Sequence, residues 1–88
     1  MIYKSKYNFI QCFQYGIEEQ PEWFTDRVRR REVILHNEKY LPFTSTYCLI
    51  YNKGKRIECK YGDYILLYNN ELVVINKIIF EILYERVE

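Results

Sequence analysis

Residues 61–75 read YGDYILLYNNELVVI, and residues 76–84 continue as NKIIFEILY. The two apolar runs around Asn69-Asn70 are typical of a β-hairpin, because Asn tolerates the left-handed conformation that a two-residue loop requires. The second run, residues 72–75, has no polar position, so we expect a strand that is central or covered on both faces. This part of the chain has the highest density of apolar side chains, and the core must be built on it.

The next segment, residues 77–84, is predicted to be a short C-terminal helix with Asn76 as its N-cap. Its apolar side chains form three separate rows, which cover more of the helix surface than one core-facing stripe needs. Either the helix is wedged deep into the fold or it contacts a second subunit. We favour a homo-oligomer. The expected interface residues are Ile78, Ile82 and Leu83.

A strand and a second helix are predicted in the N-terminal part of the chain. Residues 7–15 alternate between two faces and are rich in aromatic and branched side chains, which favours a strand covered partly on both sides. Pro21 suits the first turn of a helix that we expect to end near Arg31. Acidic residues lie near the start of this helix and four Arg lie near its end, as the helix dipole favours.

Residues 46–61 predict a further hairpin, with Gly54 supplying a positive φ in its loop. A two- or four-residue loop places Cys48 opposite Cys59, whereas a three-residue loop places Tyr47 opposite Cys59. In either register one face of the second strand is apolar and the other is charged. The side chains expected on the core side are Ile57, Cys59 and Tyr61.

These elements predict one domain over residues 1–88 of the α+β class. We expect a small antiparallel sheet of about four to five strands, one helix after the first strand and a short C-terminal helix. The chain contains ten Tyr, five Phe and one Trp, more rings than a small core encloses. The surplus indicates either a contact surface or the coding bias of an AT-rich genome.

The charge and hydropathy pattern excludes several classes of function. The net charge is +1, so nucleic-acid binding is not expected, because there is little attraction for a phosphate backbone. No run approaches the roughly 18 apolar residues of a membrane span. The N-terminus lacks the apolar run of a signal peptide. We therefore expect a soluble intracellular protein with no membrane partner.

Motifs for catalysis and for metal binding are missing. Cys12, Cys48 and Cys59 form no CxxC pair, and His36 is the one histidine, whereas a zinc site needs about four closely spaced ligands. We expect buried free thiols, no metal and no cofactor. The sequence also has no Gly-rich phosphate loop and no nucleophile with a partner base. We expect a protein that is not an enzyme.

The candidate ligand contacts lie on the first helix and the 46–61 hairpin. The Arg cluster at the helix end is either a phosphate or acidic-surface contact or a solvated helix end. Trp23 is either a core residue or a stacking platform. The residues predicted to bind a ligand or partner are Trp23, Arg27, Arg30, Arg31, Tyr47 and Tyr51.

Several short motifs follow one another in order along almost the whole chain. They are Cys12-Phe13-Gln14-Tyr15, Pro21-Glu22-Trp23-Phe24, Gly62-Asp63-Tyr64-Ile65, Asn70-Glu71, Ile79-Phe80 and Tyr84-Glu85. In this order and spacing the chain resembles a family of short, uncharacterised phage and prophage proteins. That family carries a Gly after its first helix, where this chain has the Arg run, and Pro-Cys-Lys-Pro where this chain has residues 74–77.

The resemblance implies a phage origin and no agreed activity. Small accessory phage proteins of this size commonly neutralise host defence. The expected function is therefore to counter host antiviral defence in the host cytoplasm, by sequestering a signalling nucleotide as an oligomer. The alternatives are a capping inhibitor of a host defence protein, such as a CRISPR nuclease, and a structural or accessory phage component.

Overall fold

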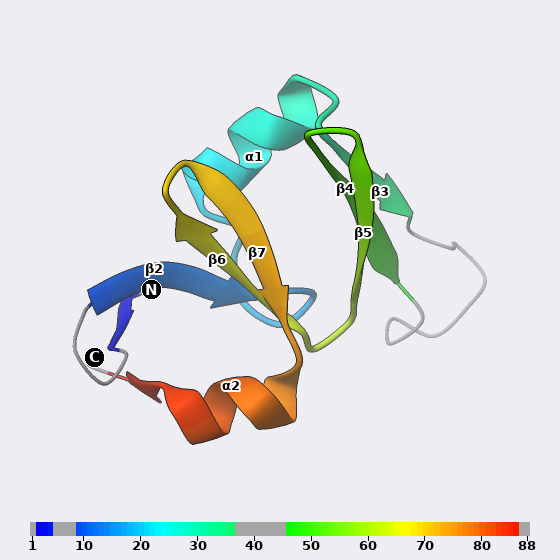
Figure 1. Cartoon of the computed structure of the whole chain (residues 1–88). Helices are drawn as coiled ribbons and strands as arrows, with labels where there is room; N and C mark the ends of the chain where they lie inside the picture. Colours follow the sequence, from blue (N-terminus) through cyan, green and yellow to red (C-terminus); the bar gives the residue numbers. More distant parts are fainter. Residues whose placement is uncertain (1, 5–8, 37–45, 87–88) are drawn as a thin grey trace.

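The computed structural model describes residues 2–4, 9–36 and 46–86. Eight strands and two helices lie in this part of the chain (Figure 1). In chain order they are β1 (Ile2–Lys4), β2 (Phe9–Gln14), α1 (Glu22–Arg29), β3 (Val33–His36), β4 (Tyr47–Asn52), β5 (Lys55–Lys60), β6 (Tyr64–Tyr68), β7 (Glu71–Ile75), α2 (Lys77–Leu83) and β8 (Glu85–Arg86). The strand predicted from Tyr7 is seen from Phe9, and Tyr7 and Asn8 lie outside the described residues.

The α+β class is confirmed, but the strands form two antiparallel sheets where one was expected. One sheet has the order β3-β4-β5. The other has β2, β6 and β7 as its longer strands, extended by the short β1 and β8 in the order β7-β6-β2-β1-β8. The difference arises because the β4–β5 hairpin pairs with β3, which follows α1 directly.

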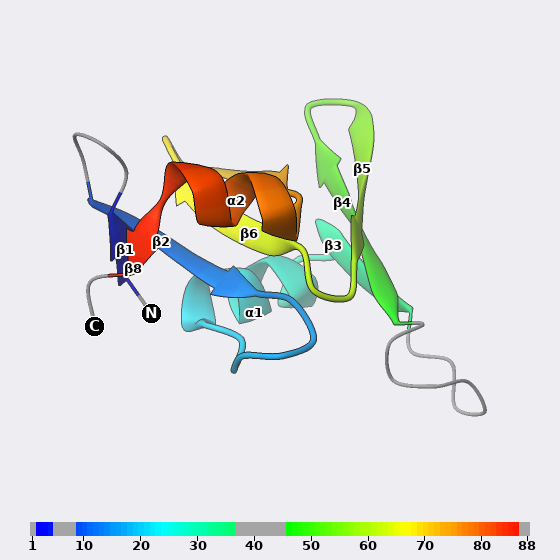
Figure 2. The same cartoon turned by 90° about the horizontal axis from the view of Figure 1, so that it is seen from below.

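The β2, β6 and β7 strands of the five-stranded sheet are covered on both faces, because successive side chains of a strand point to opposite sides. Phe13 and Ile65 pack with α1 and the three-stranded sheet, whereas Cys12 and Leu66 pack with α2. Figure 2 shows α1 and α2 on opposite sides of β2 and β6. β7 is also covered on both faces, as expected, but it lies at the sheet edge and is not central.

Aromatic rings fill both cores. Phe24 of α1 is fully buried, and its ring lies edge-on to Phe13, with the ring centroids 4.9 Å apart, and to Tyr15 at 6.2 Å. On the other face Phe80 of α2 is fully buried and stacks on Tyr64, with the centroids 3.8 Å apart. Each helix therefore contributes one deeply buried ring to its side of the sheet.

The hairpin loops have the conformation that the sequence predicts. Lys53 and Gly54 have φ of 47° and 80°, and Asn69 and Asn70 have φ of 47° and 66°, as two-residue type I′ loops require. The two-residue loop in the β4–β5 hairpin sets Cys48 opposite Cys59.

All three cysteines are free thiols and buried, which confirms that prediction. Burial is the main reason that the pKa of the Cys12 thiol is raised to about 12. A hydrogen bond with Cys48, together with burial, also raises the pKa of Cys59. Raised pKa values keep thiols protonated and unreactive near neutral pH.

Helix α2 has the predicted N-cap but is not wedged into the fold. The Asn76 Oδ1 accepts a hydrogen bond of 2.8 Å from the Ile78 backbone N–H, and Tyr84 is already extended at the other end. Phe80 is the buried side chain of this helix. The alternative in which the C-terminal helix is wedged deep into the fold, to bury its three apolar rows, is therefore wrong.

Candidate functional site

Two of the predicted ligand contacts, Arg27 and Arg30, interact with other parts of the chain. The Arg27 guanidinium donates to the Asn70 carbonyl in the β6–β7 loop and lies 3.8 Å from a carboxylate oxygen of Glu32. Arg30 pairs with Asp26 one helical turn earlier and lies 3.6 Å from Glu32. The hydrogen bond from Arg30 is the main reason that the pKa of Asp26 is lowered. These contacts fix the end of α1, which argues against a role in holding a ligand.

Trp23 also packs inside the protein. Its half-buried indole lies edge-on to Phe13, with ring centroids 5.8 Å apart and planes at 69°. It packs against the core between α1 and the two sheets. The core alternative for Trp23 thus fits the structure better than the stacking platform.

Arg31 differs from its neighbours in its backbone. Its φ is 63°, which ends α1 two residues before the predicted boundary. The Arg31 N–H donates to the Val28 carbonyl at 3.0 Å, and the Glu32 N–H donates to the Arg27 carbonyl at 3.0 Å. These two bonds are the Schellman arrangement, in which Gly is the most common residue at the left-handed position. The Arg31 side chain is exposed and makes no hydrogen bond or ion pair with the described residues.

We expect Arg31→Gly to raise the free energy of unfolding by about 0.5–1 kcal/mol, because Gly adopts positive φ without the clash that an L side chain makes. Chemical denaturation followed by the fluorescence of the single Trp measures this change. Arg31→Ala is the matched control, because it removes the same side chain and keeps the strain. A destabilised Arg31→Gly protein would contradict this account of the helix end.

Tyr47 and Tyr51 lie on the side of the three-stranded sheet that faces away from the core. We call this surface the outer sheet face. It consists of Ile34, His36, Tyr47, Leu49, Tyr51, Arg56, Glu58 and Lys60. Alternation along the strands places these side chains opposite to the buried Val33, Cys48, Ile50 and Cys59.

Each Tyr on the outer sheet face has a basic residue directly across from it on β5. Tyr51 pairs with Arg56, and Tyr47 pairs with Lys60. On its other side Tyr47 is opposite His36, and the two rings stack with centroids 4.7 Å apart and planes at 3°. Residues directly opposite in an antiparallel pair lie on the same face, so each Tyr has a cation beside it on β5, and Tyr47 also has the His36 ring beside it on β3.

Arg56, Lys60 and His36 were not among the predicted contacts. Arg56 and Lys60 could have been found from the hairpin sequence, since the register with a two-residue loop places them opposite Tyr51 and Tyr47. The partner of His36 was not predicted, because the sequence analysis did not pair the segment around His36 with the 46–61 hairpin.

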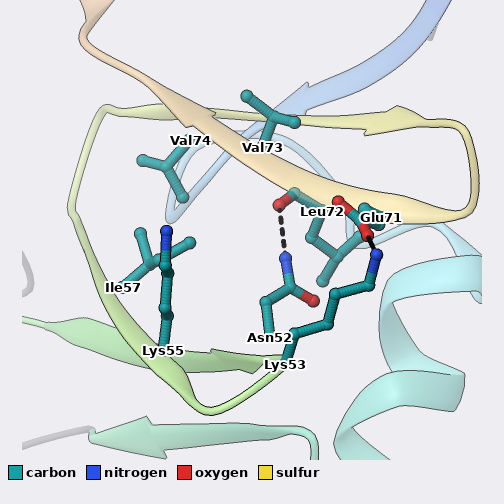
Figure 3. A pocket seen from close by; sticks show the side chains of 8 residues that line it. All are labelled: Asn52, Lys53, Lys55, Ile57, Glu71, Leu72, Val73 and Val74. Atoms are coloured by element: carbon teal, nitrogen blue, oxygen red, sulfur yellow. Dashed lines mark hydrogen bonds and ion pairs between the residues drawn. The ribbon is translucent and has the colours of Figure 1, made fainter.

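A cleft lies between the β4–β5 hairpin and β7, with a volume of about 360 Å³ (Figure 3). Its apolar lining comes from Ile57, Leu72, Val73 and Val74. At the mouth the Lys53 Nζ lies 2.5 Å from Glu71, a pairing that raises the pKa of Lys53 and lowers that of Glu71. The Asn52 side-chain amide donates to the Leu72 carbonyl at 3.1 Å.

The predicted interface residues form an exposed apolar face on α2. Ile78, Ile82 and Leu83 are 70, 77 and 56% exposed, and Ile79 beside them is 53% exposed. Phe80 is the residue that attaches α2 to the sheet, so the rest of its apolar surface faces outward. All three predicted residues are therefore exposed side chains of α2.

Within residues 2–4, 9–36 and 46–86, no group of three or more His, Cys, Asp or Glu side chains is arranged to bind a metal ion. In the same ranges no helix is both long and apolar enough to cross a membrane. Comparison with known proteins finds no matching family model, no similar curated protein and no similar solved structure.

Proposed function

We propose that this chain is a non-catalytic phage protein that counters host defence by sequestering a signalling nucleotide on its outer sheet face. The observation that carries the proposal is the pairing of each Tyr on β4 with a cation on β5. Tyr47 lies between His36 and Lys60, and Tyr51 lies beside Arg56. The earlier expectation that Trp23, Arg27 and Arg30 contact the ligand is replaced by these residues of the sheet.

The chemistry of this surface suits a nucleotide. A base that stacks on an exposed Tyr contributes roughly 1–3 kcal/mol of binding free energy. The Arg56 guanidinium can bind phosphate oxygens through two hydrogen bonds, and Lys60 supplies a point charge. Glu58 lies between these two cations on β5, so stacking rather than net charge supplies most of the affinity.

The spacing of the two Tyr side chains favours a ligand with two bases. Tyr47 and Tyr51 are four residues apart on the same strand, which corresponds to roughly 13 Å. Leu49 lies between them on the same face and offers an apolar floor. A cyclic dinucleotide carries two bases joined by phosphates, and it is the class of signal that matches two stacking positions.

Calorimetry with cyclic di-adenylate, cyclic di-guanylate and cyclic AMP tests the proposal. We expect the dinucleotides to bind, and Tyr47→Ala to weaken binding by about 5- to 100-fold, because one stacking position is lost. Tyr68→Ala is the matched control, since Tyr68 is 61% exposed on β6 and outside the outer sheet face. No heat with any of these nucleotides, or equal losses for both variants, would contradict the proposal.

A second candidate function is the capping of a host defence protein by the same face. It is favoured by Ile34 and Tyr51, which are 43 and 42% exposed beside Leu49 and Arg56. Exposed aromatic and Arg side chains around an apolar centre are typical of binding hot spots. A host protein recovered in stoichiometric amount, and lost with Tyr51→Ala, would favour capping over sequestration.

We further propose that α2 joins two copies of the chain. Lys77 and Glu81 are one turn apart and line one flank of the exposed apolar face. In an antiparallel contact related by a two-fold axis, the Lys77 of one copy lies close to the Glu81 of the other. Such a contact covers Ile78 and Ile82 with the same residues from the second copy. A dimer presents two outer sheet faces and sequesters two ligands per assembly.

A further inference from the structure

Strand β7 is an edge strand whose backbone is only half used. It pairs with β6 on one side and with no other strand among the described residues. The pairs alternate between hydrogen-bonded and non-hydrogen-bonded in an antiparallel ladder. Since Tyr68 and Glu71 flank the two-residue loop as a hydrogen-bonded pair, Val73 and Ile75 also bond to β6. The N–H and C=O groups of Leu72 and Val74 therefore point away from β6.

The contact with Asn52 supports this direction independently. The Leu72 carbonyl accepts from the Asn52 side chain, which belongs to the hairpin across the cleft. The Leu72 N–H and both backbone groups of Val74 have no partner within the described parts of the chain. Unpaired backbone groups at a sheet edge are a template for another strand.

The sequence of β7 lacks the features that usually prevent edge pairing. Edge strands are commonly protected by Lys, by Pro, by a bulge, by extreme shortness or by a covering element, and here the β4–β5 hairpin covers the edge at Leu72 through Asn52 and leaves a cleft beside Val74. β7 reads ELVVI over five residues, with one charge at its start, and its pairing with β6 is regular from Glu71 to Ile75. Its side chains are held by the cores on both faces, so the edge is presented rigidly.

The cleft beside this edge supplies the remaining contacts. Its apolar wall includes Ile57 and Val74, which can take an apolar side chain of an added strand. In Figure 3 Lys55 extends alongside Ile57 toward the strand that carries Val74. The Lys55 ammonium makes no hydrogen bond or ion pair with the described residues, whereas Lys53 is neutralised by Glu71. The charge left over in the cleft is positive.

We propose that the β7 edge is a docking site for a short, extended, acidic peptide segment of a partner protein, which binds by strand addition. The peptide backbone pairs with the outward N–H and C=O of Val74 and with the Leu72 N–H. One peptide side chain lies against Ile57 and Val74, and an acidic side chain pairs with Lys55. This site is separate from the outer sheet face and does not depend on nucleotide binding.

The premise is tested first by amide hydrogen exchange on the protein alone. We expect the Val73 and Ile75 amides to exchange slower than the Leu72 and Val74 amides, on the order of a hundredfold, because only the first two are bonded to β6. Equal protection of all four amides would overturn the assignment of the outward groups.

Binding is tested by fluorescence anisotropy with labelled peptides of sequence Asp-Val-Asp-Val-Asp and Lys-Val-Lys-Val-Lys. We expect the acidic peptide to bind and the basic peptide to bind at least tenfold more weakly. Val74→Pro removes the outward N–H without breaking a bond to β6, whereas Val74→Ala keeps that N–H and also shortens the side chain. We expect at least a tenfold loss with Val74→Pro relative to Val74→Ala.

A second measurement applies if Val74→Pro does not fold. Two versions of the acidic peptide are made, each methylated on one of the two sets of alternate backbone nitrogens. In strand addition only one set of N–H groups points toward β7, so one methylated peptide should lose binding and the other should retain it. Equal binding of both methylated peptides, or no binding of the acidic peptide to the unmodified protein, would overturn the proposal. We expect Tyr47→Ala to leave peptide binding unchanged and Val74→Pro to leave nucleotide binding unchanged. The two proposed sites can therefore be tested independently.

Discussion

Phe24→Ala is expected to cost about 3–5 kcal/mol of the free energy of unfolding, because it removes a fully buried ring and leaves a cavity. The ring contacts Phe13 and Tyr15 and lies between α1 and both sheets. A domain of this size has a total stability of roughly 5–10 kcal/mol, so the variant is expected to be partly unfolded near 37 °C. Urea denaturation measures the loss.

The single Trp makes this experiment direct. Trp23 precedes Phe24 and its indole packs on Phe13, so its fluorescence reports the same core. Phe24→Leu is the matched control, because it keeps an apolar side chain of nearly the right volume and should cost less than half as much. A loss below about 1 kcal/mol for Phe24→Ala would mean that α1 does not close the core between the sheets.

Ile82→Lys is expected to halve the mass of the protein in solution. Ile82 is 77% exposed in the single chain, so a Lys there costs little when the chain is alone. In the proposed α2 contact the same position is covered by the second copy near its Ile78, where a Lys ammonium would lose water without gaining a partner. Sedimentation equilibrium at several protein concentrations gives the mass.

Ile17→Lys is the control for this substitution, because Ile17 is 52% exposed in the β2–α1 loop and outside the apolar face of α2. Its mass should equal that of the unmodified protein. Circular dichroism shows whether both variants are folded. An unchanged mass for a folded Ile82→Lys protein would contradict the assembly proposal. The nucleotide and peptide sites are tested by their own binding measurements.

Local sequence signals predicted the hairpins well and the assembly of the sheets poorly. Asn69-Asn70 and Gly54 adopt the left-handed conformation expected of hairpin loops. The sequence left two registers open for the β4–β5 hairpin, and the structure has the one that pairs Cys48 with Cys59. The pairing of β3 with β4 joins strands separated by a long connection, and no local pattern encodes it. β1 and β8 have three and two residues, too few to show any alternation.

The candidate site was predicted in part, for the same reason. Tyr47 and Tyr51 were predicted as contacts from the surplus of rings, and the structure places them on the outer sheet face, alternating with the buried Cys48 and Ile50. Arg27 and Arg30 are paired within the chain, and the sequence does not show that Arg27 reaches the β6–β7 loop. Ile82 could be assigned to an excess of apolar surface, but its exposure depends on how α2 attaches to the sheet, which it does through the buried Phe80 and the neighbouring Tyr84.

The pairing of β8 with β1 has a consequence for how the protein folds. Tyr3 is aligned with Arg86, and Lys4 with Glu85, so this contact closes nearly the whole chain into a ring. Closing so long a loop costs conformational entropy, and only a few backbone hydrogen bonds between β1 and β8 offset that cost. We infer that the β4–β5 and β6–β7 hairpins form early and that the β1–β8 edge forms last. The same edge is then the first to open when the native state fluctuates.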